Sequence, residues 1–565
     1  MLNLDASTTS GLLDSNFGYA SIADIGLGES LDQLFQRSDA LLNRESGEDI
    51  EDAQFRLYRD SLGAESTGYA LDSAAVNAAS QLDTQTVKPA PAPPRQDLLT
   101  GQSVAQPLVG SRESAIAMLD QALSDINSDI DGEALPASIT GGSWRIVEGD
   151  LTANRFTIDH GYSHNVISGN GNVNFGDGAY DWIDLSYLNS SAVVDSGFTR
   201  LNTGDGARVF DTFHLGDGSA ISFEGIERVA FADTVLDLAV TPNDTFFNDQ
   251  WNLHITGVHT AWRFTQGSED VLVGVQDTGL GLDGLGQLHE DLNAENTLGI
   301  ASNIGDDFFR NVPGQGQGAR TDSHGTAVQG IIAAESNNGI GVSGINWESN
   351  VLAVDVLDNN AGDQSPAQAT ANMIDYARQQ GQRLVINMSF GGGSIDPALE
   401  QLIADSQEDA LFVISTGNSD QSSLFNPASL AASYSNVIAV GASWGTETVF
   451  GETVDPGTRI SYPGMWGSNY GFGITLMGPS EVFTTAASPD GFGYQAQFNG
   501  TSAAAPNVAG IASLVWSANS ELSASTVATI LAQTAYDLGA EGYDFEYGNG
   551  LVNADAAVRR AIALA

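Results

Sequence analysis

The sequence predicts an α/β protein built around a doubly wound parallel sheet, preceded by a small β-rich module and a loosely ordered leader. Three observations support this class. From residue 241 to residue 565, short apolar runs typical of strands buried on both faces alternate with segments of helical length. Between residues 143 and 240, short β segments are separated by Gly-Asp-Gly and Gly-Asn-Gly turns. Residues 1–142 mix short amphipathic stretches with a Pro/Ala linker around residues 88–94.

The composition restricts the functions that the chain can have. It has 565 residues, a hydrophobic content of 42% and a formal net charge of −51, so most of the charge must lie on surfaces and in loops. Lys88 is the only lysine, and binding to nucleic acid or to anionic lipid is therefore electrostatically opposed. Cations are the expected partners. Such a surface fits salty or calcium-rich surroundings, and it also serves solubility alone.

The chain contains no cysteine, which excludes disulfides, thiolate zinc sites and a cysteine nucleophile. The printed sequence has no run of about 18 apolar residues. Its first thirty residues lack the basic and apolar regions of a standard signal peptide. We therefore expect no membrane span, and the sequence does not reveal an export route. The leader, residues 1–142, is a candidate propeptide, although no pattern identifies a folded inhibitory domain.

The β-rich module, residues 143–240, carries carboxylates in its turns. Residues 176–185 resemble a degenerate calcium-binding repeat of the RTX type, in which turns offer carboxylate and carbonyl oxygens to Ca²⁺. Residues 223–233 resemble the strand segment that follows such repeats. A plain β module without metal explains the same pattern, because a full repeat array is missing. Calcium binding by this module is one of two open interpretations.

The remaining residues, 241–565, have the pattern of a parallel sheet with helices on both faces. The predicted strands are residues 271–275, 351–357, 383–388, 410–414 and 436–440. Helices are predicted between them, for example at residues 365–380 and 398–409. In such sheets, functional sites lie beyond the carboxyl ends of the strands.

Asp277 follows the first of these strands, within Gln-Asp-Thr-Gly. This position presents a side chain to the expected site. The motif is ambiguous alone, because an Asp after a strand is commonly a turn or cap residue. Asp-Thr-Gly is also typical of aspartic peptidases, which use two carboxylates that share a proton.

Two further segments place a histidine and a serine at helix starts. In residues 322–334, His324 opens a helix rich in small residues. In residues 498–510, Ser502 enters a long apolar helix. Free N–H groups at a helix start stabilise a developing oxyanion, so this position suits a nucleophilic serine, although an ordinary N-cap explains Gly-Thr-Ser alone.

The three segments together, in the order Asp, His, Ser, resemble those of the subtilisin-like serine peptidases. The resemblance covers residues 243–565 and includes the late segment 547–554. It implies an endopeptidase that cleaves polypeptides through an acyl-enzyme intermediate, secreted by a bacterium and monomeric. It also implies that Ser502 is the nucleophile, His324 the general base and acid, and Asp277 the residue that orients His324.

The same resemblance assigns further site residues. Asn418, in Ser-Thr-Gly-Asn, matches the side-chain donor of the family's oxyanion hole. Two segments would pair with an extended substrate. Their members are Ser389, Phe390 and Gly391 in the first, and Ser415 and Gly417 in the second. A glycine-rich loop and a Gly-Asn turn are the alternative interpretations.

A calcium site is also implied. The loop at residues 336–342 resembles the calcium loop of many family members. Asn338 would supply a side-chain oxygen and Asp291 a carboxylate, with carbonyl oxygens from Ser336, Ile340 and Val342. An insertion after Asp277 makes the register of Asp291 provisional.

The subfamily clues conflict. Residues 502–506 and 289–292 are similar to kexins, whereas residues 277–279 are closer to bacterial subtilisins. Cleavage after paired basic residues is therefore not inferred. Two other functions stay open: an aspartic peptidase that uses Asp277, and a non-catalytic calcium-dependent binding protein with a relic peptidase domain.

Overall fold

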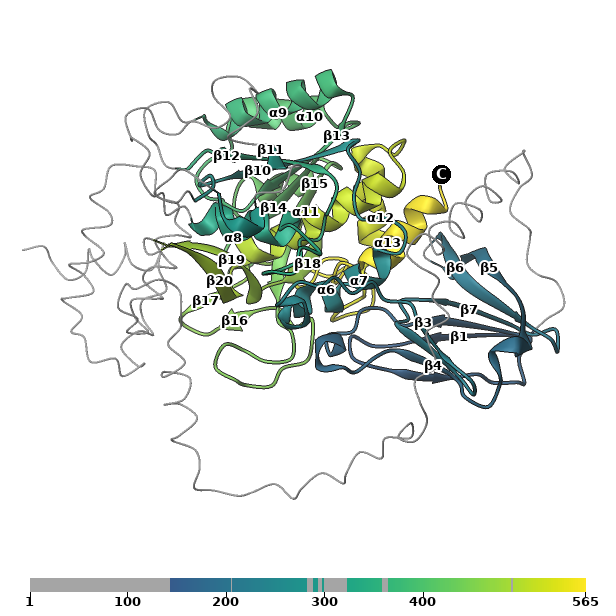
Figure 1. The fold of residues 1–565 in the computed structure, drawn as a ribbon. Helices are drawn as coiled ribbons and strands as arrows, with labels where there is room; N and C mark the ends of the chain where they lie inside the picture. The colour runs from purple at the N-terminus through teal and green to yellow at the C-terminus, as the bar shows by residue number, and fades with distance from the viewer. Residues whose placement is uncertain are drawn as a thin grey trace, which may run out of the picture.

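The computed structural model describes residues 143–204, 206–281, 288–292, 297–298, 323–357, 364–488 and 491–565 (Figure 1). The predicted leader, residues 1–142, lies outside the described residues. Among the described residues, no helix combines the length and the apolar character needed to cross a bilayer.

The larger part of the described chain is organised around a parallel seven-stranded sheet with the order β11-β12-β10-β13-β14-β15-β18. Its strands are β10 (Val271–Asp277), β11 (Thr297–Leu298), β12 (Asn350–Asp355), β13 (Arg383–Met388), β14 (Ala410–Ser415), β15 (Val437–Ser443) and β18 (Leu476–Pro479). The predicted doubly wound sheet is confirmed, and its strands lie where the apolar runs placed them.

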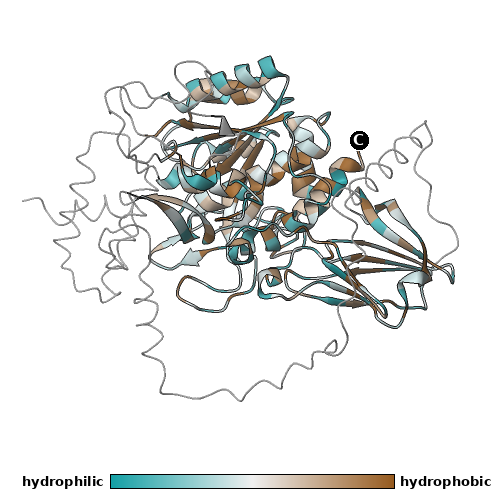
Figure 2. Cartoon of the chain, in the orientation of Figure 1, coloured by the Kyte–Doolittle hydropathy of each residue, from teal (hydrophilic) through white to brown (hydrophobic). Residues whose placement is uncertain are grey.

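Alternate side chains of each strand enter two separate cores. In β10, Val273 and Val275 belong to one core and Leu272 to the other. In β14, Val413 belongs to the first core and Phe412 to the second. This follows from the period of two in a strand, and it explains why both faces of the sheet need apolar residues. Figure 2 shows the central strands and α11 as predominantly hydrophobic.

Helices cover both faces of the sheet. The first core contains residues of α8 (Ser323–Ala333), α11 (Thr501–Ala518), α12 (Ala524–Gln533) and α13 (Ala554–Ile562). The second core contains residues of α9 (Pro366–Gln380) and α10 (Pro397–Asp405). A capping box explains the start of α9, since the Ser365 and Gln368 side chains each bond the backbone N–H of the other. The predicted helix 398–409 ends earlier, at Asp405, where the Ser406 N–H bonds the Ile403 carbonyl.

Smaller elements complete this part of the chain. Two short helices, α6 (Trp251–Ile255) and α7 (Val258–Ala261), precede the sheet. Two antiparallel pairs follow β15: β16 (Ser461–Tyr462) with β17 (Trp466–Gly467), and β19 (Val482–Ser488) with β20 (Gly491–Phe498).

In the β-rich module, successive strands alternate between two sheets. In one sheet β1 (Trp144–Glu148), β3 (His164–Ser168) and β7 (Ala220–Glu224) run parallel. In the other, β2 (Arg155–Thr157), β4 (Trp182–Leu185) and β8 (Arg228–Phe231) run parallel, followed by β9 (Val235–Asp237). A hairpin of β5 (Val193–Asn202) and β6 (Ala207–Leu215) is inserted before β7.

Glycines permit the close stacking of successive turns in this module. A Cβ at Gly169 would lie 2.1 Å from the carbonyl oxygen of Gly225, and a Cβ at Gly149 would lie 2.9 Å from that of Gly169. The turn carboxylates of Asp150 and Asp217 accept hydrogen bonds from their own turns. Across the described residues, no group of three or more His, Cys, Asp or Glu side chains is placed to hold a metal ion. Calcium binding by the module therefore gains no support from this geometry.

A buried network of charges joins the module to α13 and α7, which lie beside it in Figure 1. The Arg559 guanidinium, 1% exposed, donates to Asp555 at 2.6 Å, to Asp211 at 2.8 Å and to the Val209 carbonyl at 2.9 Å. Arg263 donates to both carboxylate oxygens of Asp211, at 3.0 and 2.8 Å. Burial raises the pKa of Asp211, but Arg263 and Arg559 outweigh burial and hold that pKa at about 2.

The network predicts a large stability loss when one of its members is removed. We expect Asp211→Ala to lower the free energy of unfolding by about 3–5 kcal/mol, because Arg263 and the buried Arg559 lose the carboxylate that they share. Denaturant titration measures this loss.

Asp237→Ala is the matched control within the module. Asp237 pairs with Arg228 at 2.5 Å, but its side chain is 48% exposed. Removing such a surface pair is expected to cost about 0–1 kcal/mol. Equal losses for the two variants would contradict the proposed importance of the buried network.

Candidate active site

Asp277 is the last residue of β10 and is 1% exposed. Its Oδ1 accepts a hydrogen bond from the Thr278 backbone N–H at 2.7 Å. The same oxygen lies 2.7 Å from Nδ1 of His324. A buried carboxylate at this distance fixes the orientation of the imidazole and favours a proton on Nδ1.

His324 lies in the first turn of α8, and its side chain is 20% exposed. The helix approaches β10 closely because Gly325 has no side chain: a Cβ there would lie 2.1 Å from the Gly279 carbonyl oxygen. The Gly325 N–H donates to the Thr278 hydroxyl at 3.1 Å. On the other side, the His324 ring meets the Phe498 ring edge to face, with centroids 5.4 Å apart.

The middle of α8 is held by β19. The hydroxyls of Thr484 and Thr485 donate to the Ala327 and Thr326 carbonyls at 2.8 and 2.7 Å. Gly330 allows this contact, since a Cβ there would lie 2.1 Å from the Thr485 hydroxyl oxygen. The small residues noted in the sequence therefore position the helix that carries His324.

Ser502 is the second residue of α11 and is 3% exposed. Its hydroxyl donates to the Ser389 carbonyl at 3.0 Å. Pro506 stands four residues later and has no N–H to bond the Ser502 carbonyl. The Ser389 hydroxyl bonds that carbonyl instead, at 3.0 Å, and accepts in turn from the Asn387 amide at 3.0 Å. The proline in α11 is thus compensated by a side chain from the end of β13.

Asn418 follows β14 and faces the start of α11. Its Oδ1 accepts from the backbone N–H and from the hydroxyl of Thr501, at 2.8 and 3.0 Å. The amide group is therefore oriented with its oxygen toward Thr501, and its nitrogen is available to donate elsewhere. Thr501 was not singled out from the sequence, although it precedes Ser502 directly. Only the fold shows that it orients Asn418.

The two expected substrate-binding segments lie at the ends of adjacent parallel strands. Ser389, Phe390 and Gly391 follow β13, and Ser415 ends β14, with Gly417 two residues beyond. Phe390 is 7% exposed and packs in the second core, so only its backbone can face a substrate. The Gly417 N–H donates to the Thr501 hydroxyl at 3.1 Å.

The expected calcium residues lie together around one loop. Asp291 accepts from the Asn338 side-chain amide and from the Val342 N–H, both at 2.9 Å. The Asn338 Oδ1 accepts from the Ile340 N–H at 2.8 Å, and the Ser336 hydroxyl donates to backbone carbonyls of the same region. Direct hydrogen bonds hold the loop in this arrangement.

The donor set of this loop suits a hard cation. Asp244 accepts from the N–H groups of Asn337 and Asn338, at 2.8 and 3.2 Å, so a second carboxylate faces the loop. Burial, together with the nearby Asp244, raises the pKa of Asp291 to about 6, although hydrogen bonds from Val342 and Asn338 lower it. Two carboxylates and loop carbonyls are ligands that Ca²⁺ accepts, provided that the Asn338 amide turns its oxygen inward.

His289 has a structural position beside this loop. Its Nδ1 lies 3.0 Å from the Asp291 backbone nitrogen, which donates to it, and its Nε2 lies 2.7 Å from the Gly493 carbonyl. Both ring nitrogens are therefore occupied, as expected for a structural residue.

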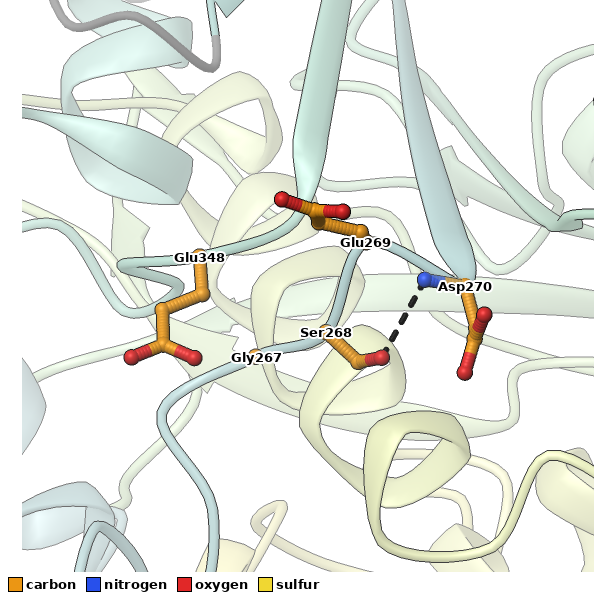
Figure 3. Close-up of a pocket in the computed structure, with 5 residues that line it drawn as sticks. All are labelled: Gly267, Ser268, Glu269, Asp270 and Glu348. Atoms are coloured by element: carbon orange, nitrogen blue, oxygen red, sulfur yellow. Dashed lines mark hydrogen bonds between the residues drawn. The ribbon is translucent and has the colours of Figure 1, made fainter.

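A hollow at the opposite end of β10 is separate from this site. Figure 3 shows its lining residues: Gly267, Ser268, Glu269, Asp270 and Glu348. The Asp270 N–H donates to the Ser268 hydroxyl at 3.1 Å. Asp270 precedes β10, whereas Asp277 ends it. We assign this acidic hollow no function.

The fold and the site define a class: a doubly wound α/β protein in which a buried aspartate orients a histidine and a serine lies in the first turn of a buried helix. Residues 268–550 match the model of the subtilase family, which is half of the chain. The chain belongs to the subtilase family.

Known proteases are among its relatives. The extracellular protease of Xanthomonas campestris pv. campestris is 33% identical over 368 residues, which are 58% of this chain and 59% of the relative. The thermophilic serine proteinase of Bacillus sp. AK1 is 31% identical, over 58% of this chain and 72% of the relative. Subtilisin DY of Bacillus licheniformis is 34% identical, over 51% of this chain and 91% of the relative.

Proposed function

We propose that this chain is a serine endopeptidase whose catalytic triad is Asp277, His324 and Ser502. The observation that carries the proposal is the 2.7 Å contact between the buried Asp277 carboxylate and His324 Nδ1. The His324 ring also contacts Phe498, four residues before Ser502. The family of the chain and the named proteases among its relatives support the same reaction class.

The proposed reaction begins when His324 Nε2 takes the hydroxyl proton of Ser502 as the serine oxygen attacks the scissile carbonyl. Asp277 stabilises the resulting imidazolium. The tetrahedral intermediate collapses when His324 passes its proton to the leaving amine, and an acyl-enzyme remains. Water, deprotonated by His324, then releases the acid and restores the serine.

The oxyanion of the tetrahedral intermediate would be held by two donors. One is the Ser502 backbone N–H in the first turn of α11, where the helix dipole is positive. The other is the Asn418 amide nitrogen, because the amide oxygen is occupied by Thr501. Donors that are oriented before the reaction stabilise charge without reorganisation.

The substrate would bind as an extended strand along residues 389–391 and 415–417. Extracellular action is proposed because a named relative is an extracellular protease. Calcium is proposed as a structural ion held by Asp291 and the loop at residues 336–342, where it would offset the repulsion between Asp291 and Asp244.

The catalytic proposal is tested with Ser502→Ala. The wild-type protein is expected to degrade casein and to be labelled at Ser502 by a fluorophosphonate, and Ser502→Ala is expected to do neither. Equal casein degradation by both proteins, or inhibition only by a statine-type peptide, would favour the aspartic peptidase. Absence of degradation by the wild type would favour the non-catalytic binding protein.

Asn418→Asp tests the oxyanion hole. Aspartate keeps the oxygen that accepts from Thr501 but removes the amide donor. We expect kcat to fall by about 10²–10³, the loss known for the equivalent donor of the relative subtilisin, with little change in KM. Gln421→Ala, on the exposed part of the same loop, is the control with unchanged kcat. An unchanged kcat in Asn418→Asp would reject this donor.

Calcium removal tests the proposed ion. Because an ion bound only to the folded state stabilises it by mass action, EDTA is expected to lower the Tm of Ser502→Ala, and added CaCl₂ to restore it. In Asp291→Asn the difference between EDTA and CaCl₂ is expected to shrink. A Tm that is independent of EDTA would exclude a structural calcium ion.

A further inference from the structure

Phe425 lies between the two segments that flank Ser502. A Cβ built on Gly417 would lie 2.5 Å from Cδ2 of the Phe425 ring. A Cβ built on Gly391 would lie 3.2 Å from the Phe425 Cβ and 3.8 Å from its Cδ2. The side chain of Phe425 therefore spans the space between the end of the β13 segment and the end of the β14 segment, in direct contact with a glycine on each side.

Hydrogen bonds fix Phe425 in this position. Its N–H donates to the Thr416 carbonyl at 3.0 Å, on the β14 side. The next residue, Asn426, accepts from the Gly392 N–H and donates to the Gly393 carbonyl, each at 2.8 Å, on the β13 side. The segment 425–426 thus forms a floor that is bonded to both walls.

Gly417 is also packed against a second side chain, that of Asn469. The side chain of Asn469, which is fully buried, would meet a Gly417 Cβ at 2.6 Å and donates to the Thr416 carbonyl at 3.1 Å. Its oxygen accepts from the N–H groups of Ser419 and Gln421, at 2.9 and 3.1 Å. A side chain held by three hydrogen bonds supports the Phe425 side of the wall.

Both walls are tied to the nucleophile. On one side the Ser389 carbonyl accepts from the Ser502 hydroxyl, and on the other the Gly417 N–H donates to Thr501. If an acyl group is attached to Ser502 with its oxygen toward Asn418, its side chain enters the space between these walls. Phe425 contacts a glycine in each of these walls, Gly391 and Gly417.

We propose that Phe425 determines specificity by closing the pocket for the residue that donates the acyl group, so that substrates with Gly, Ala or Ser before the scissile bond are preferred over those with aromatic residues. This inference rests on the proposed function. A rigid ring held on two sides cannot yield to a second large side chain, and each excluded group of atoms lowers kcat/KM by about 10-fold or more.

The test compares peptide p-nitroanilides that differ only in the last residue, succinyl-Ala-Ala-Pro-Ala and succinyl-Ala-Ala-Pro-Phe. In the wild type, kcat/KM for the Ala substrate is expected to exceed that for the Phe substrate by at least about 10-fold. Phe425→Ala is expected to reverse the order, and Phe425→Leu to give an intermediate ratio. The ratio is independent of the fraction of folded enzyme, because the same site acts on both substrates.

Phe472→Ala is the control. Phe472 is 72% exposed, so the removal of its ring is expected to leave the ratio unchanged. A wild type that prefers the Phe substrate, or a ratio unaltered by Phe425→Ala, would overturn the inference while leaving the endopeptidase intact. If the wild type cleaves neither these substrates nor casein faster than Ser502→Ala, the proposed function itself fails.

Discussion

The site depends on the close approach of two helix starts to the carboxyl edge of the parallel sheet. The 2.7 Å contact between Asp277 and His324 exists because Gly325 lets α8 come within van der Waals contact of the chain after β10. The start of α11 comes equally close to the ends of β13 and β14, through bonds from Ser502 to Ser389 and from Thr501 to Asn418. Larger side chains at these contacts would move the helices that carry His324 and Ser502 away from the sheet.

The same contacts compensate for a hydrogen bond that is missing from α11. Pro506 removes a hydrogen-bond donor from α11, and the orphaned carbonyl is that of Ser502. The Ser389 hydroxyl satisfies this carbonyl, and the Ser389 carbonyl receives the Ser502 hydroxyl. One residue at the end of β13 therefore contacts both polar groups of the proposed nucleophile. In the proposed reaction, this arrangement would hold the acyl group between the segments that Phe425 contacts.

The β-rich module is a structural partner of this domain, joined to it by buried charges. Arg559 bonds carboxylates from both parts, Asp555 and Asp211, and the Gly225 N–H donates to Asp555 at 2.9 Å. In a chain with a formal net charge of −51, arginine is scarce, and three arginines are used at or near this interface. Buried partners of this kind are costly to separate, because each charge would be left without its counterpart.

The sequence by itself determined the parallel sheet, because its strands follow from local patterns. Asp277, His324, Ser502 and Asn418 were assigned by the joint resemblance of their segments to the subtilisin-like peptidases. Apolar runs mark the buried strands, and small residues beside a histidine or a serine mark helix starts. The tertiary structure alone decided which distant residues meet. Arg559 reaches Asp211 across 348 residues, and Phe425 comes between Gly391 and Gly417, because both contacts arise from the packing of complete elements. No local pattern encodes such packing, so the wall that Phe425 forms became visible only in the folded chain.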